Sequence, residues 1–243
     1  MNDRLALGEM SPDVVAIVTD IDNTLAKRDD ASETLSSHTR RAFGQWLQAR
    51  IDDSPVSAAL ELRSAVESEI GEVSTDTVIN HAYQWIREQR QSPALETALG
   101  EFWRTGYAEN SLDNTLAPDA VAGLEFWAED RRALFIFSER PRVAQQALIS
   151  HSDHGDLGEL FAGFFDTRMG PPDSPATYHT IAAALGEIPA SILFISATLD
   201  SLDAAAEAGW QTCFIVRDAE TEEVADQQND HPVVTGFDSI ELL

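Results

Sequence analysis

Two aspartates stand two residues apart where a buried apolar run ends. Residues 14–19 form a short β-branched run, and Asp20 and Asp22 follow it. One carboxylate of such a pair can attack phosphorus, while the other protonates the leaving oxygen and later deprotonates the attacking water. Clustered carboxylates also favour Mg²⁺, which screens their repulsion of an anionic substrate. The pair predicts a phosphoryl-transfer site; the alternative, a plain turn, is disfavoured by the strand context and by Thr24.

The elements that position this pair follow a parallel-sheet pattern. Short apolar runs without alternation are typical of strands buried on both faces. Helical patterns separate them, which predicts a doubly wound α/β core with its ligand site at the carboxyl ends of the strands. The expected strands are Val14–Thr19, Ala133–Ser138, Ile192–Ser196 and Thr212–Val216, and the expected helices between them include Val143–His151, Ala176–Leu185 and Leu202–Ala208.

Residues 31–114 break this alternation. They contain several amphipathic stretches and no convincing strand, so an all-helical insertion is expected there. The predicted domains are a core of residues 1–30 and 115–243 and a helical domain of residues 31–114. The acidic segment 218–230 is expected to be a solvated loop before a last strand near residues 232–235.

Net charge restricts the partners. The chain has 42 acidic and 16 basic residues, a formal charge of -26, and Lys27 is its single lysine. Such a surface disfavours nucleic acid and anionic lipid. Two explanations stay open: adaptation to a high-salt cytoplasm, which we favour, or a face reserved for a basic partner.

Compartment and redox chemistry follow from what the sequence contains. No apolar run approaches the roughly 20 residues that cross a bilayer, and the N-terminus does not resemble a signal peptide, so a cytoplasmic protein is expected. The single cysteine, Cys213, lies in an apolar segment. It is expected to be a buried small hydrophobe, and a disulfide framework is excluded.

Several segments together resemble one known family. Residues 18–24 (Val-Thr-Asp-Ile-Asp-Asn-Thr) look like the first motif of haloacid dehalogenase (HAD) phosphatases. Further segments are similar to the enolase-phosphatases, or acireductone synthases, of methionine salvage: 102–107, 117–119, 151–152, 155–157, 160–167, 170–171, 192–196, 202–205 and 207–212. This resemblance implies a HAD-like Rossmannoid core with a helical cap. It also implies a monomeric, Mg²⁺-dependent phosphatase that enolises and then dephosphorylates 2,3-diketo-5-methylthiopentyl 1-phosphate.

The resemblance also assigns roles by position. Asp20 would be nucleophile and metal ligand, and Asp22 would be the acid/base with its backbone carbonyl on the metal. Ser138 would donate a hydrogen bond to the phosphate. The remaining residues of the expected phosphate- and substrate-binding set are Thr24, Glu139, Trp103 and Tyr107. The last two, four apart on one helical face, would line a pocket for the methylthio tail or simply pack the cap.

Three departures fall on this site. Pro172 stands where the family has a lysine, and Ala197 where it has a metal-binding aspartate. The family's Ser-Ser-Gly-Ser becomes residues 138–141, Ser-Glu-Arg-Pro, which adds a carboxylate that would repel phosphate. Asp200 is a replacement candidate for the lost ligand. Replacement candidates for the lost cation are Lys27, Arg140, Arg142 and Arg168.

The sequence therefore leaves two hypotheses. One is a HAD-type phosphomonoester hydrolase acting on a small phosphorylated metabolite, with altered activity. The other is a non-catalytic homologue that binds a metabolite or a protein.

Overall fold

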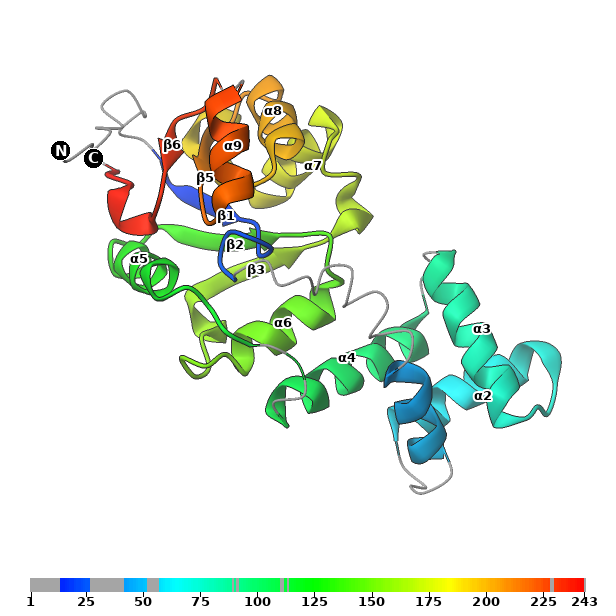
Figure 1. The fold of residues 1–243 in the computed structure, drawn as a ribbon. Helices are drawn as coiled ribbons and strands as arrows, with labels where there is room; N and C mark the ends of the chain where they lie inside the picture. Colours follow the sequence, from blue (N-terminus) through cyan, green and yellow to red (C-terminus); the bar gives the residue numbers. More distant parts are fainter. Residues whose placement is uncertain are drawn as a thin grey trace. The chain divides into compact units, whose positions relative to one another are not determined.

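The strands of the core form one parallel sheet. The computed structural model of the protein describes residues 14–26, 42–51, 57–88, 90, 92–109, 112, 114–227 and 230–242. Within this part of the chain, six strands pair in the order β3-β2-β1-β4-β5-β6 (Figure 1). They are β1 (Ala16–Thr19), β2 (Ala133–Phe137), β3 (Phe161–Phe165), β4 (Ile192–Ser196), β5 (Gln211–Ile215) and β6 (Val233–Val234).

Helices cover both faces of this sheet. In Figure 1, α5 (Pro118–Glu129) and α6 (Arg142–Ser150) lie on one side, with α7 (Pro175–Leu185), α8 (Leu199–Glu207) and α9 (Ala219–Gln227) on the other. Strand β1 is hydrogen-bonded to β2 on one side and to β4 on the other. The chain reverses its direction across the sheet at this β1/β4 pair, which is the switch point where such sheets bind ligands. The predicted doubly wound α/β fold is confirmed.

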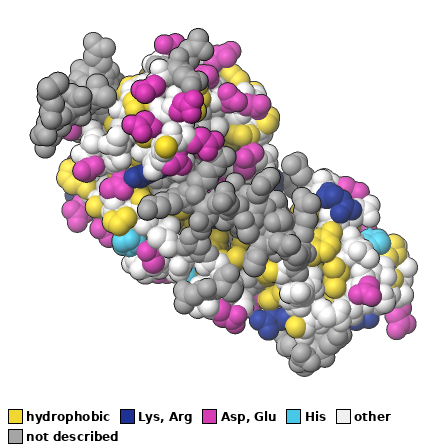
Figure 2. All heavy atoms as spheres, viewed as in Figure 1, with side chains coloured by type: hydrophobic (Ala, Val, Ile, Leu, Met, Phe, Trp, Pro, Cys, Tyr) yellow, Lys and Arg dark blue, Asp and Glu magenta, His cyan; other side chains and the backbone are white. Residues whose placement is uncertain are grey.

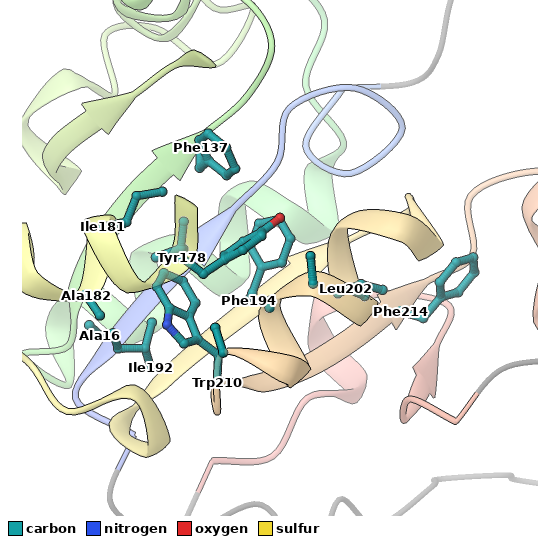
Figure 3. Close-up of a cluster of buried hydrophobic side chains, with 14 residues drawn as sticks. Ala16, Phe137, Tyr178, Ile181, Ala182, Ile192, Phe194, Leu202, Trp210 and Phe214 are labelled. Carbon is teal, nitrogen blue, oxygen red and sulfur yellow. The ribbon is translucent and has the colours of Figure 1, made fainter. Parts of the chain in front are cut away.

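A hydrophobic cluster joins α7 and α8 to the sheet. Ala16 and Val18 of β1 face this cluster, since alternate side chains of a strand point to the same face. Tyr178 and Trp210 meet edge to face with ring centroids 5.3 Å apart (Figure 3). Cys213 is buried, and burial raises the pKa of its thiol to about 12. A thiol in this environment is inert, as expected.

Two sequence-based expectations fail in the core. The segment 218–230 is not simply a loop, because it contains α9. The Asp218 carboxylate accepts a hydrogen bond from the Thr221 amide (2.8 Å) at the start of this helix, and Val224 packs against the core. The edge strand β3 was not expected at all, because Phe-Ala-Gly-Phe-Phe lacks β-branched residues and contains a glycine.

The helical part forms a second unit. The chain divides into one compact unit of residues 1–28 and 114–243 and another of residues 29–113. The second unit contains α2 (Ala58–Ile70), α3 (Thr75–Arg87), α4 (Pro93–Ala108) and a helical stretch at 42–51. Side chains of Ser74 and Ser92 cap the starts of α3 and α4. Throughout the described residues, every helix is too short or too polar to span a bilayer.

Candidate active site

Asp20 lies where the carboxyl ends of three strands meet. Its backbone amide donates to the carbonyl of Ile195, so the backbone pairing of β1 with β4 extends to this residue. Its carboxylate accepts hydrogen bonds from the Ile21 amide (2.7 Å) and from the Ser196 hydroxyl at the end of β4 (3.3 Å). The Ser138 hydroxyl, just beyond β2, also lowers the pKa of this carboxyl and so favours its charged form. Asp20 is thereby oriented by groups from β1, β2 and β4.

The surroundings of Asp20 disfavour its charge. Burial and, to a smaller extent, the neighbouring charge of Asp22 raise the pKa of this carboxyl to about 7, against the lowering effect of Ile21, Ser138 and Ser196. At neutral pH the carboxylate is therefore only partly ionised. Strongly shifted carboxyls at the ligand edge of a sheet are typical of functional sites.

The loop after Asp20 is held by its own hydrogen bonds. Asn23 adopts a left-handed conformation (φ 55°), and its side-chain amide donates to Asp218 (2.9 Å). The buried Thr24 hydroxyl donates to the carbonyl of Asp22 (3.4 Å) and accepts from the amide of Ala197 (3.2 Å). These contacts give Thr24 a structural role in joining the loop to the residue after β4.

Asp22 is paired with an arginine from a distant loop. Arg140 donates to both carboxylate oxygens of Asp22, from Nε to Oδ2 at 3.2 Å and from Nη2 to Oδ1. The two side chains are 13% and 30% exposed, so this bidentate pair is largely shielded from water. The buried amide of Gln145 donates to the carbonyls of Arg140 and Phe165, both at 2.7 Å, and so fixes the loop that carries the arginine.

Comparison with known proteins places this geometry in a family. The model for haloacid dehalogenase-like hydrolases matches residues 14–209. Curated proteins named enolase-phosphatase E1 are also similar. The protein from Serratia proteamaculans is 34% identical over 93% of this chain and 96% of its own length. The protein from Azotobacter vinelandii is 35% identical over 94% of this chain and 97% of its own length. The chain belongs to the haloacid dehalogenase-like hydrolases. Within them it is a diverged member of the enolase-phosphatase branch.

Solved structures support the same fold. The UTR4 protein from Saccharomyces cerevisiae has a TM-score of 0.72 and 23% identity over 93% of this chain and 100% of its own. CbbY from Rhodobacter sphaeroides, solved in complex with xylulose-(1,5)bisphosphate, has a TM-score of 0.55 and 18% identity over 92% of this chain and 95% of its own. At these identities the likeness concerns the fold alone.

This HAD-like hydrolase has no cation at the expected lysine position. Pro172 offers only its carbonyl, which accepts a hydrogen bond from the Tyr178 hydroxyl (2.8 Å). Of the candidate replacements, Arg168 pairs with Asp166 at 2.9 Å, and Arg142 is exposed on α6. Lys27 lies outside the described residues. Arg140 is thus the candidate found at the aspartate pair.

The donor set does not fit Mg²⁺, which the family resemblance implies. Mg²⁺ takes oxygen ligands in near-octahedral geometry. Ala197 supplies no side-chain oxygen, the Asp22 carboxylate is bonded to Arg140, and Asp200 is exposed. In the part of the chain that the structure describes, no group of three or more His, Cys, Asp or Glu side chains could hold a metal ion.

The other expected site residues are distributed over both units. Ser138 is buried beside Asp20, whereas Glu139 is exposed. Trp103 and Tyr107 are buried on α4 of the helical unit, with rings stacked at 6.1 Å. Sequence reasoning missed Ser196 and Gln145. A hydroxyl at the end of a buried parallel strand was a usable signal for Ser196, but nothing in the sequence pointed to Gln145.

Proposed function

We propose that the chain is a phosphomonoester hydrolase that uses Asp20 as its nucleophile. One observation carries the proposal: the Asp20 carboxylate stands at the ligand edge of the sheet and is oriented by Ile21, Ser196 and Ser138. An oxygen of Asp20 would bond to phosphorus as the bond to the ester oxygen breaks, giving an aspartyl-phosphate. Ser138 would donate to a phosphoryl oxygen during this transfer.

Asp22 would handle the proton in both steps. It would take up a proton from solvent as the phosphate binds, give that proton to the leaving ester oxygen, and then accept a proton from the water that attacks the aspartyl-phosphate, which releases phosphate and restores Asp20. Arg140 would keep the Asp22 side chain in place and offset one of the two negative charges that an incoming phosphate meets. Loss of a well-placed charge commonly lowers a rate by about 10²–10³, so Pro172 and Ala197 imply slow turnover.

The proposed substrate is a small phosphorylated metabolite. Its first candidate is 2,3-diketo-5-methylthiopentyl 1-phosphate, because curated relatives over nearly the whole chain are named enolase-phosphatase. In this proposal the helical unit, residues 31–114, acts as a cap, and Trp103 and Tyr107 receive the apolar tail of the substrate. The protein would act as a monomer in the cytoplasm.

A non-catalytic binding role is the second candidate. The observation that favours it is the Asp22–Arg140 pair together with Ala197, which replaces a metal-binding carboxylate by a methyl group. A chain that kept the scaffold and lost the chemistry would bind a metabolite or a protein partner without turnover.

Phosphate release decides between the two roles. Purified protein in multimolar salt is incubated with the diketo phosphate and with a panel of phosphate monoesters, beside Asp20→Asn. The hydrolase releases phosphate, and Asp20→Asn does not, because an amide cannot form the acyl phosphate. Equal signals from both proteins would contradict hydrolysis. In that case, a rise in Tm with a phosphate ester would support the binding role, and an unchanged Tm would exclude small phosphate esters as its ligand.

A further inference from the structure

We infer that Arg140 takes the place of Mg²⁺ as the counter-ion of the Asp20–Asp22 pair, so that this site operates without a divalent cation. The inference rests on the site proposed above. It concerns the charge balance of that site, which is independent of whether turnover occurs.

The first argument is the contact itself. Arg140 reaches Asp22 with two nitrogens on two oxygens, the fork-to-fork arrangement that gives charged hydrogen bonds their greatest strength and specificity. A guanidinium stays protonated at any pH a protein experiences, so it cannot be neutralised to make way for a metal. A Mg²⁺ ion on the backbone carbonyl of Asp22, the ligand that the family resemblance implies, would be repelled by this permanent positive charge on the same residue.

The second argument is how the arginine is held. Its side chain is 13% exposed, and the loop around it is anchored by the buried Gln145, which binds the carbonyls of Arg140 and Phe165. Pro141 follows directly and leads into α6. Because both the loop and the side chain are constrained, the arginine loses little further entropy in keeping this contact.

The third argument is the set of oxygen atoms left for a metal. The backbone amide of Ala197 points to the Thr24 hydroxyl, and the carbonyl of Asp22 accepts from that same hydroxyl. Among the contacts described, the carboxylate of Asp22 is bound by a cation and that of Asp20 is not. A Mg²⁺ ion bound through a single carboxylate takes its other ligands from substrate phosphate and water, so without a substrate Asp20 alone is a weak Mg²⁺ site.

Titration with Mg²⁺ tests this inference. Calorimetry at constant ionic strength compares the wild type with Asp20→Asn, and a thermal melt compares Mg²⁺ with an equal ionic strength of NaCl. We expect the wild type to bind Mg²⁺ no more tightly than Asp20→Asn and to melt at the same temperature in both salts. Mg²⁺ binding that disappears in Asp20→Asn would overturn the inference.

Two double variants show whether Arg140 is responsible. Arg140→Gly with Ala197→Asp restores the family's residues at both positions, and we expect it to bind Mg²⁺ at least about tenfold more tightly than the wild type. The matched control, Arg142→Gln with Ala197→Asp, removes the charge of the exposed Arg142 and keeps Arg140. Equal affinities in the two would contradict the role given to Arg140. If either variant fails to fold by circular dichroism, the wild-type titration still decides.

Failure of the proposed function is distinguishable from failure of this inference. Phosphate release that persists in EDTA supports both. Release that requires Mg²⁺ supports hydrolysis and overturns the inference. Absence of release, with no specific Mg²⁺ binding by the wild type, contradicts hydrolysis and leaves the charge assignment to Arg140 supported.

Discussion

Arg217 binds Asp119 through two hydrogen bonds, each 2.8 Å long, from Nη1 to the two carboxylate oxygens. The same guanidinium donates to the carbonyl of Thr24 from Nε (3.0 Å) and Nη2 (2.8 Å). Asp119 also accepts from the amide of Phe237 (2.9 Å). One ion pair thus joins the loop after β1 to the start of α5 and to the C-terminal turn.

Removing this carboxylate is expected to destabilise the core. The side chains of Arg217 and Asp119 are 9% and 28% exposed, so Asp119→Ala leaves a partly buried guanidinium unpaired. We expect the free energy of unfolding to fall by about 3 kcal/mol, measured by urea denaturation. Glu101→Ala is the control, since its pair with Arg104 is exposed on α4 and is worth less than about 1 kcal/mol. Similar losses in both variants would contradict the role given to Asp119.

Asp20→Asn is expected to stabilise the protein in EDTA at high pH. The pKa of Asp20 is raised to about 7 by burial and by Asp22, so between about pH 4 and 7 the native state binds more protons than the unfolded state. Stability from this group is complete below that range and is lost as pH rises through 7.

The difference between Asp20→Asn and the wild type isolates this effect from the other acidic groups. We expect the free energy of unfolding of Asp20→Asn to equal that of the wild type at about pH 4. At pH 8 we expect it to exceed the wild-type value by on the order of 2–4 kcal/mol in urea unfolding. A difference that stays constant across this range would contradict the raised pKa.

Gly170→Ala is expected to disturb the loop that carries Pro172. Gly170 has φ +135°, and an added Cβ would lie 2.2 Å from the Thr177 hydroxyl oxygen. That hydroxyl donates to the carbonyl of Pro171 (2.8 Å), so the clash reaches the loop. We expect the free energy of unfolding to fall by at least about 2 kcal/mol.

Gly155→Ala is the matched control for this substitution. Gly155 also has a positive φ (+94°), but nothing lies within 4 Å of an added Cβ. It therefore carries only the backbone cost, about 1 kcal/mol. Urea unfolding of the two variants should separate them, and equal losses would mean that Thr177 moves aside at no cost.

Salt is expected to stabilise this chain strongly. Its formal charge is -26. Figure 2 shows one face of the molecule, and acidic side chains are spread over the described part of it. Because salt screens repulsion among exposed charges, the urea midpoint should rise markedly from low salt to multimolar KCl. The proposed adaptation to a high-salt cytoplasm would be abandoned if the midpoints were similar in both.

The hydrophobic pattern of the sequence was sufficient to predict the parallel core and the position of Asp20. Four of the strands coincide with the apolar runs of the sequence, and a carboxylate that directly follows a strand of a parallel sheet lies at the ligand edge. The same local reasoning failed for α9, because its N-terminal capping residue Asp218 and its packing residue Val224 stand in an acidic segment that is typical of a loop. It also missed β3, where pairing with β2 at the sheet edge outweighs weak strand propensity.

The sequence by itself determined which groups are present at the site: two aspartates, Pro172 for the lysine and Ala197 for the metal ligand. Only the tertiary structure decided which arginine binds to the aspartate pair. Arg140 and Asp22 are 118 residues apart, and their pairing depends on the β1–β2 register and on the loop anchored by Gln145. The sequence shows which charged residues are present, but only folding fixes the distances between them. The energy of an electrostatic interaction depends on that distance.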